Sequence, residues 1–160
     1  MGKKGFTLIE LLAVIVILGI ISLIVVPVLT NSYNDSKKKS EDIFLERLSS
    51  VIGSYISLNS DTINFDSTFT ARKKNSDTVV DVYQGKITIN DLIDSKLLSL
   101  EDFVNPGNKK ANCNVNTEIE VFRDSDFVYC HKMKRMDCLS AAYDANTYVI
   151  NTCEWESELS

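Results

Sequence analysis

The 160-residue chain is poor in the side chains that most often carry out chemistry, with one histidine and four cysteines. It contains no C-x-x-C pair, no G-x-S-x-G turn, no phosphate-binding loop and no metal-ligand spacing. Its single histidine, His131, lies among Lys132, Lys134 and Arg135, and no adjacent carboxylate orients it. Because neighbouring cations lower a histidine pKa, we interpret His131 as a surface residue. The sequence therefore predicts no enzyme, no cofactor and no metal site.

Charge is almost missing from a long stretch near the N-terminus. Residues 6–29 are apolar apart from a few small polar side chains, and Glu10 is their only charged residue. As a helix at about 1.5 Å per residue, this stretch spans roughly 36 Å, enough to cross a hydrocarbon core of about 30 Å. No A-x-A-like cleavage site follows it, so we expect the helix to stay in the mature protein. Lys3 and Lys4 favour a cytoplasmic N-terminus, with the following residues outside.

The rest of the chain lacks a large basic surface. Leaving Lys3, Lys4 and Glu10 out of the 17 basic and 22 acidic residues gives a formal charge of −6. About 130 residues are enough for one compact domain and too few for two of typical size. The acidic balance makes nucleic acid a minor alternative as a partner.

Residues 4–12 read KGFTLIELL. This segment resembles the processing signal of type IV pilins and pseudopilins. The resemblance implies that a prepilin peptidase cuts between Gly5 and Phe6 and methylates the new amine of Phe6. It also implies that Glu10 pairs with the N-terminal amine of a neighbouring subunit in a filament. An ordinary signal anchor that begins with the same residues is the alternative, and it leaves Glu10 unexplained.

The chemistry of these residues fits the resemblance. Gly5 has no side chain, so a protease can approach its backbone closely. Glu10 lies one turn after Phe6, where the positive end of the helix dipole favours a carboxylate by about 0.3–1 kcal/mol. A charge at the centre of a membrane helix costs about 2.5–3.5 kcal/mol, so a buried Glu10 needs a cation. The freed amine of an adjacent chain is such a cation.

The spacing beyond the membrane segment predicts that the helix continues to about residue 58, roughly 80 Å from residue 6. Its apolar side chains recur at steps of three and four, namely Phe44, Leu48, Val51, Tyr55 and Leu58, broadened by Leu45, Ile52 and Ile56. Pro27 removes a backbone donor, so we expect a kink or an extended turn at residues 23–27. Pro27 also falls where many pilins carry a helix-loosening proline; an ordinary proline kink is the alternative.

The remaining residues predict a loop, a short helix and a sheet. Residues 59–77 are polar and are interpreted as a loop, with the basic run 72–74 in solvent. Thr88 is positioned to cap a helix over residues 89–98. The other predicted elements are a strand at 78–83, a hairpin of 118–122 and 127–130, a helical turn at 139–143 and a strand at 147–150. The fold class is α+β and pilin-like, with a long N-terminal helix packed on a small antiparallel C-terminal sheet.

Four cysteines lie in the predicted extracytoplasmic part, where disulfides persist. Sequence alone permits three pairings, and free buried thiols are a further alternative. We expect Cys113–Cys130 and Cys138–Cys153, which would close the hairpin and the C-terminal loop separately.

The predicted organisation is a leader at 1–5, a transmembrane and assembly helix at 6–29, its amphipathic continuation at 30–58 and a globular head at 59–160. The resemblance implies a structural subunit of a type IV pilus or related pseudopilus, of Gram-positive type. Such a subunit is inserted into the cell membrane as a prepilin and then displayed at the surface. Its expected partners are other pilins, the prepilin peptidase and the assembly ATPase with its platform.

Two alternatives remain open at this point. The first is a minor, tip, competence or type II secretion pseudopilin that binds DNA or a surface. The second is a membrane-anchored enzyme or receptor, which the absent catalytic site and Glu10 disfavour.

Overall fold

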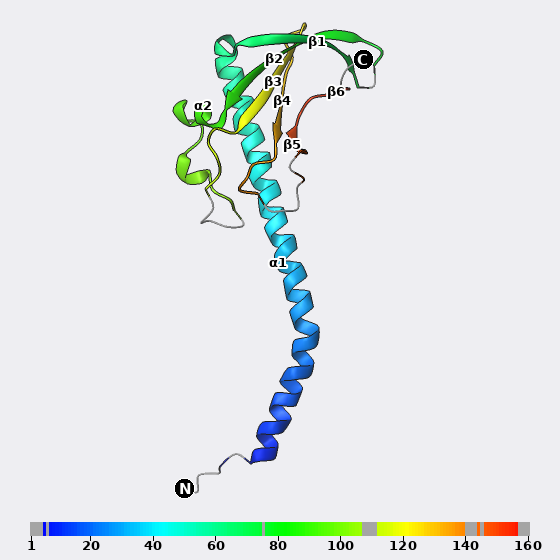
Figure 1. The fold of residues 1–160 in the computed structure, drawn as a ribbon, viewed down its shortest axis with the longest axis vertical. Coiled ribbons are helices and arrows are strands. Elements are labelled where there is room, and N and C mark those ends of the chain that lie inside the picture. Colours follow the sequence, from blue (N-terminus) through cyan, green and yellow to red (C-terminus); the bar gives the residue numbers. More distant parts are fainter. Residues whose placement is uncertain are drawn as a thin grey trace. The chain divides into compact units, whose positions relative to one another are not determined.

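The computed structural model describes residues 5, 7–74, 76–106, 112–139, 144 and 146–156. The chain divides into two compact units, Met1–Lys39 and Ser40–Ser160. Helix α1, Leu8–Asn59, begins in the first unit and ends in the second (Figure 1).

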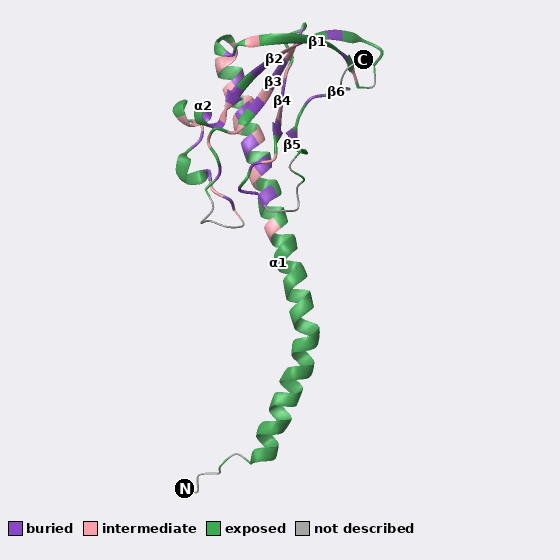
Figure 2. Cartoon of the chain, in the orientation of Figure 1, coloured by how far each residue is buried: buried purple, intermediate pink, exposed green. Residues whose placement is uncertain are grey.

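The first unit holds the apolar half of α1. Every side chain from Leu8 to Leu29 is exposed (Figure 2), and the mean hydropathy of the most apolar window is 3.2. By length and composition this helix can cross a membrane. The helix continues through Pro27, so the extended turn predicted there is absent. The Thr30 hydroxyl donates to the carbonyls of Val26 and Pro27, at 3.2 and 2.9 Å, within the same turn.

In the second unit, α1 buries one stripe of side chains. Leu45, Leu48, Ile52 and Ile56 are buried at steps of three and four, as the amphipathic spacing predicts. Leu58 was expected on this stripe but is 73% exposed, because it lies in the last turn of the helix. The helix contributes the centre of its stripe to the core, and its end is solvated.

The second unit also contains an antiparallel sheet of six strands in the order β5-β4-β3-β2-β1-β6. Their bounds are β1 Phe65–Lys73, β2 Val79–Thr88, β3 Glu118–Asp124, β4 Tyr129–Lys134, β5 Tyr148–Asn151 and β6 Trp155–Glu156. The short helix η1, Ser60–Thr62, precedes β1, and two more, α2 Ile89–Asp94 and η2 Leu100–Asp102, lie between β2 and β3. A long helix followed by an antiparallel sheet is the α+β arrangement expected from the sequence.

Several sequence-based predictions are confirmed in this unit and others are wrong. The β3–β4 hairpin and the strand β5 lie where they were expected. Thr88 starts α2, and its N–H and hydroxyl both donate to Asp91 Oδ2, at 2.6 and 2.8 Å. The helix ends at Asp94, sooner than predicted. Residues 65–73 of the predicted loop at 59–77 form β1, so that part of the prediction is wrong and the run 72–74 is not simply a solvated loop. The predicted turn at 139–143 lies mostly outside the described residues.

The two faces of the sheet carry separate apolar clusters. The inner face packs on α1 and includes Ile119, Val121, Met133 and Ile150. The outer face carries the second cluster, made of Ala71, Val80, Val82, Phe122, Cys130, Cys153 and Trp155. Neighbouring residues of a strand point to opposite faces, so these clusters assign every strand position to one face.

The disulfides are Cys113–Cys138 and Cys130–Cys153, so the predicted pairing was wrong. The hairpin places Cys130 opposite Phe122 rather than near Cys113. The Thr152 N–H donates to the His131 carbonyl at 3.0 Å, which holds Cys153 beside Cys130. Each bond closes a chain of more than 20 residues and contributes about 3.5 kcal/mol by the chain-entropy estimate.

Candidate functional site

The start of α1 is built by two residues, Thr7 and Glu10. The Thr7 N–H and hydroxyl donate to Glu10 Oε2, at 2.9 and 2.8 Å. In return, the Glu10 N–H lies 3.4 Å from the Thr7 hydroxyl and 3.1 Å from its carbonyl. This reciprocal arrangement is a capping box, which satisfies backbone donors that the first helical turn would otherwise leave open. The T-x-x-E spacing that signals it is present in the sequence, but the sequence-based interpretation did not use it.

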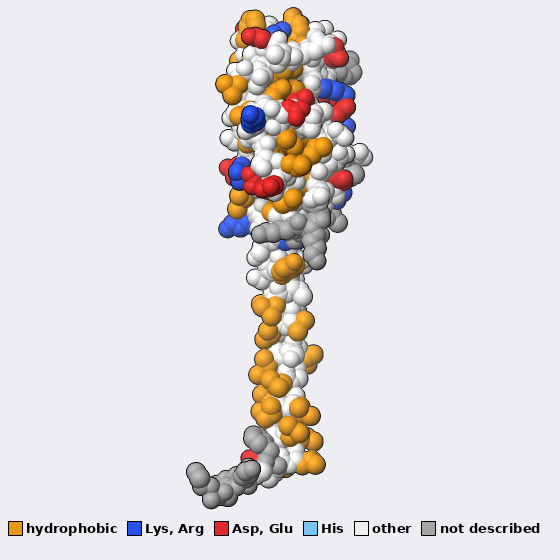
Figure 3. Space-filling view, turned by 90° about the vertical axis from the view of Figure 1, so that its left-hand side faces the viewer, with side chains coloured by type: hydrophobic (Ala, Val, Ile, Leu, Met, Phe, Trp, Pro, Cys, Tyr) orange, Lys and Arg blue, Asp and Glu red, His pale blue; other side chains and the backbone are white. Residues whose placement is uncertain are grey.

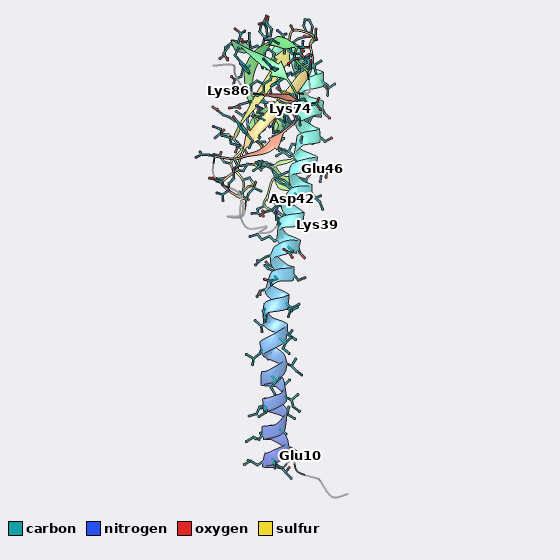
Figure 4. All side chains as sticks on the ribbon, turned by 90° about the vertical axis from the view of Figure 1, so that its right-hand side faces the viewer. Glu10, Lys39, Asp42, Glu46, Lys74 and Lys86 are labelled. Carbon is teal, nitrogen blue, oxygen red and sulfur yellow. A yellow bond between two sulfur atoms is a disulfide. The ribbon has the colours of Figure 1, made fainter. Side chains whose placement is uncertain are left out.

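The capping box leaves part of the Glu10 carboxylate available. Both donations from Thr7 end on Oε2, and within the described residues no partner contacts Oε1. Glu10 lies in the first turn of the apolar helix, at the end nearest the processing signal (Figure 4). An oxygen with a lone pair free, held in place by its own helix start, can accept a hydrogen bond from an ammonium group.

The predicted cleavage position is only partly described. Among the described residues, an added Cβ at Gly5 would meet nothing within 4 Å, so no described side chain covers the backbone there. Phe6, the predicted methylation site, lies outside the described residues, as do Lys3 and Lys4. Gly5 and Glu10 are the two members of the predicted site that the structure describes.

The helix that carries Glu10 exposes an unusual amount of apolar surface. Large apolar side chains emerge on every side visible in Figure 3, and the 17 between Leu8 and Leu29 are each at least 41% exposed. The hydroxyl of Ser22, an uncharged polar side chain in this stretch, donates to the Leu18 carbonyl at 2.7 Å. Surface of this kind requires lipid or other helices to cover it.

Comparison with known proteins identifies the segment. Residues 1–26 match the family model of the prokaryotic N-terminal methylation motif. The chain carries a type IV prepilin signal. The matched residues include Gly5, Phe6 and Glu10, and the match supports a precursor of the pilin or pseudopilin type. Searches of curated proteins and of solved structures find no match to the chain.

His131 is not the surface residue that the sequence suggested. Its side chain is buried, with Nε2 2.9 Å from the Ser49 hydroxyl of α1 and Nδ1 3.3 Å from the Thr152 hydroxyl. Burial lowers the pKa of His131 to about 4 from its ordinary value of 6.5. The ring is therefore neutral at pH 7 and joins the helix to the sheet. Within the described residues, no three potential ligands gather into a metal site.

The basic cluster after His131 lies partly on β4. Lys132 and Lys134 lie on the outer face of β4, and their Nζ atoms sit over aromatic rings. The Lys132 Nζ is 5.2 Å from the Phe122 ring centre and 5.6 Å from that of Tyr148. Cations placed over rings at these distances are partly compensated within the subunit, which leaves less of the cluster for an external anion.

Proposed function

We propose that this protein is a structural subunit of a type IV pilus or a related pseudopilus. It is cleaved after Gly5, methylated at Phe6 and polymerised through its N-terminal helix. The prepilin signal on an uncovered apolar helix carries this proposal. The N-terminal segment combines a signal for processing with a surface that only lipid or other helices can bury.

The energetics favour keeping the apolar helix covered, first by the membrane and then by the helices of other subunits. Burying a large apolar side chain is worth about 1.5–3 kcal/mol. The 17 exposed side chains between Leu8 and Leu29 therefore represent a free energy of tens of kcal/mol that the isolated chain does not gain. The membrane supplies it to the precursor, and packed helices of other subunits supply it in the polymer. The subunit thus stays covered from insertion to assembly.

Glu10 fixes the axial position of one helix along its neighbour in the polymer. In the proposed polymer, the methylated amine of Phe6 from a neighbouring subunit binds the Glu10 carboxylate through Oε1. A paired charge in an apolar surrounding is tolerated, while an unpaired one is strongly disfavoured. Sliding one helix along the other would separate the pair, so the pair selects one axial position among many with similar apolar contact.

The proposed partners follow from this route. A prepilin peptidase reads the signal at the cytoplasmic side of the membrane, and an assembly ATPase with its platform drives the polymer outward. The domain beyond α1 then lies outside the cell, where its two disulfides persist. A minor or competence-type role with DNA as ligand is the weaker candidate, because Lys132 and Lys134 already lie over aromatic rings.

The experiment is N-terminal analysis of the mature protein, by mass spectrometry, in cells with an active prepilin peptidase. We expect a chain that begins with N-methylated Phe6. A chain that retains Met1 in those cells would overturn the proposal. Abundance in sheared surface filaments distinguishes a major subunit, which is plentiful, from a minor one, which is scarce.

The role of Glu10 is tested by variants that remove its charge, one of which keeps its part in capping the start of α1. We expect Glu10→Val and Glu10→Gln to be cleaved and to assemble poorly, because both lack the carboxylate. Glu10→Gln keeps an oxygen that accepts from the Thr7 N–H, so its defect reports the charge alone. Thr7→Val is the matched control, since it loses only the hydroxyl of the cap, worth about 1 kcal/mol. Normal assembly of Glu10→Gln would show that the pairing role is wrong.

A further inference from the structure

The sheet is curled over its outer face. Strand β5 lies at one edge of the sheet and β6 at the other, yet only residues 152–154 connect them (Figure 1). Four Cα steps cover at most about 14 Å, whereas the five strand spacings of a flat sheet of this size cover about 24 Å. Cys153 is bonded to Cys130 and belongs with Trp155 to the outer cluster, so the connection crosses the outer face. The two edges therefore approach each other across this face, which is concave.

A cavity of about 270 Å³ lies between this connection and the sheet. Its apolar wall includes Val128, Cys130 and Trp155. Lys73 and Asp124 line it from the sheet, and their ion pair at 3.2 Å compensates both charges. Pockets for small ligands usually measure about 300–1,000 Å³, so a cavity of this volume suits a ligand of few atoms.

Trp155, the single tryptophan of the chain, brings an unsatisfied donor to the cavity wall. The residue is 8% exposed, and within the described residues its Nε1–H has no acceptor. A buried N–H group without an acceptor costs free energy, so native structures nearly always pair it with protein, water or a ligand. An oxygen atom bound in the cavity is the acceptor that the described residues do not provide.

Two opposite charges lie at the rim of the cavity. Lys74, labelled in Figure 4, and Glu154 are both exposed, and both line it. The Lys74 N–H donates to the Glu154 carbonyl at 2.7 Å, so the two residues are neighbours. Their side chains make no ion pair with each other in the part of the chain that the structure describes. A ligand with a carboxylate alone would meet Lys74 but also lie near Glu154, so the rim matches a ligand that carries both charges.

We propose that this cavity binds a free α-amino acid with an apolar side chain. The ligand carboxylate accepts from the Lys74 ammonium and from the Trp155 N–H, and the ligand ammonium donates to Glu154. The apolar side chain packs against Val128 and Cys130. This site goes beyond the proposed function, because a subunit can polymerise through its N-terminal helix whether the cavity is empty or filled.

The test uses the detergent-solubilised full chain and follows the fluorescence of Trp155. L-leucine is the probe, and two analogues of similar size each lack one of its charges: isocaproate has no ammonium, and isoamylamine has no carboxylate. We expect a saturable change in fluorescence with leucine. Either analogue should bind about tenfold more weakly, because it leaves one charge of the rim without its partner.

Variants assign each charge of the rim to one end of the ligand. Glu154→Gln should weaken the binding of leucine about tenfold without weakening that of isocaproate, which has no ammonium to lose. Lys74→Gln should likewise weaken leucine and not isoamylamine. Trp155→Phe keeps a ring but removes the N–H, and calorimetry should show weaker binding of leucine to it.

The matched controls are Lys96→Gln and Glu101→Gln, which neutralise exposed charges that do not line the cavity. They should bind leucine normally. Equal thermal unfolding temperatures and intact disulfides show that each variant folds, so a lower affinity reports the site.

Two results would overturn the site. If leucine gives no saturable change up to about 10 mM, the cavity does not bind it, and an ordered water is left as the acceptor for the Trp155 N–H. If isocaproate binds as tightly as leucine, the ammonium contributes nothing and the assignment to an amino acid is wrong. Neither result bears on the proposed function, which fails separately, in the N-terminal analysis of the mature chain.

Discussion

The buried histidine makes a quantitative prediction about the pH dependence of stability. His131 lies between Ser49 of α1 and Thr152, which follows β5, and the residue is 6% exposed. Burial holds its pKa at about 4 in the folded protein, while the unfolded chain has the ordinary value of 6.5. Lowering the pH from 7 therefore protonates His131 first in the unfolded chain. Stability should fall between about pH 6.5 and pH 4 and then level off with respect to this group.

The magnitude follows from the distance between the two pKa values. At 1.36 kcal/mol for each pH unit between them, the loss is at most about 3 kcal/mol. Domains of this size are stable by about 5–15 kcal/mol, so a loss of this size is a large share. The neutral ring needs one donor and one acceptor, and the two hydroxyls can supply both. A protonated ring would require both hydroxyls to accept.

The assay is urea unfolding of the detergent-solubilised full chain from pH 7.5 to pH 4, with His131→Gln as the reference. Glutamine has no proton to gain in this range but keeps an amide that can bond to a hydroxyl. Carboxylates titrate alike in both proteins, so the difference between the two curves isolates His131. The unmodified chain should lose about 3 kcal/mol more than the variant across the window. Parallel curves, within about 1 kcal/mol, would refute the reasoning.

Two further predictions concern covalent closure and close packing. Replacing Cys130 and Cys153 together by serine should lower the free energy of unfolding by about 3.5 kcal/mol, measured by urea titration; a loss below 1 kcal/mol would argue against the chain-entropy account. Gly85→Ala should destabilise by about 1–3 kcal/mol, because its Cβ would lie 2.6 Å from the Asn64 carbonyl oxygen. Gly53→Ala in α1 is the matched control, since its Cβ would meet no atom of the described residues within 4 Å and the change should stabilise by about 1 kcal/mol; equal effects at both glycines would contradict the packing argument.

The sequence predicted the elements whose periodicity is regular. The long helix followed from apolar steps of three and four, and the β3–β4 hairpin from alternation around a polar turn. Strand β1 was missed because its pattern is irregular. A register shift between Phe65 and Ser67 puts Phe65 against the inner cluster, while Phe69 packs with the outer one. Two aromatic residues four positions apart on opposite faces do not show the period of a strand.

His131 shows that the sequence neighbours of a strand residue are a poor guide to its surroundings. Its neighbours in sequence, Lys132 and Lys134, are on the outer face of β4, whereas His131 pairs with Val121 on the inner face. Residues next to each other in a strand have opposite surroundings. The charges that suggested a surface position thus say nothing about the histidine, and Met133 two residues on was the better indicator. The prepilin signal was recognisable for the opposite reason, since its residues act locally at one chain end.

The disulfide connectivity sets an order on how the domain beyond the apolar helix matures. The bonds join the first cysteine to the third and the second to the fourth. A chain that emerges from the membrane N-terminal end first presents Cys113 and Cys130 together before either partner has arrived. Oxidation at that moment would link two cysteines that are apart in the native sheet, and only thiol–disulfide exchange would release them. In the proposed export route, native pairing therefore needs either a catalyst that reshuffles disulfides or oxidation slow enough for β5 to dock first.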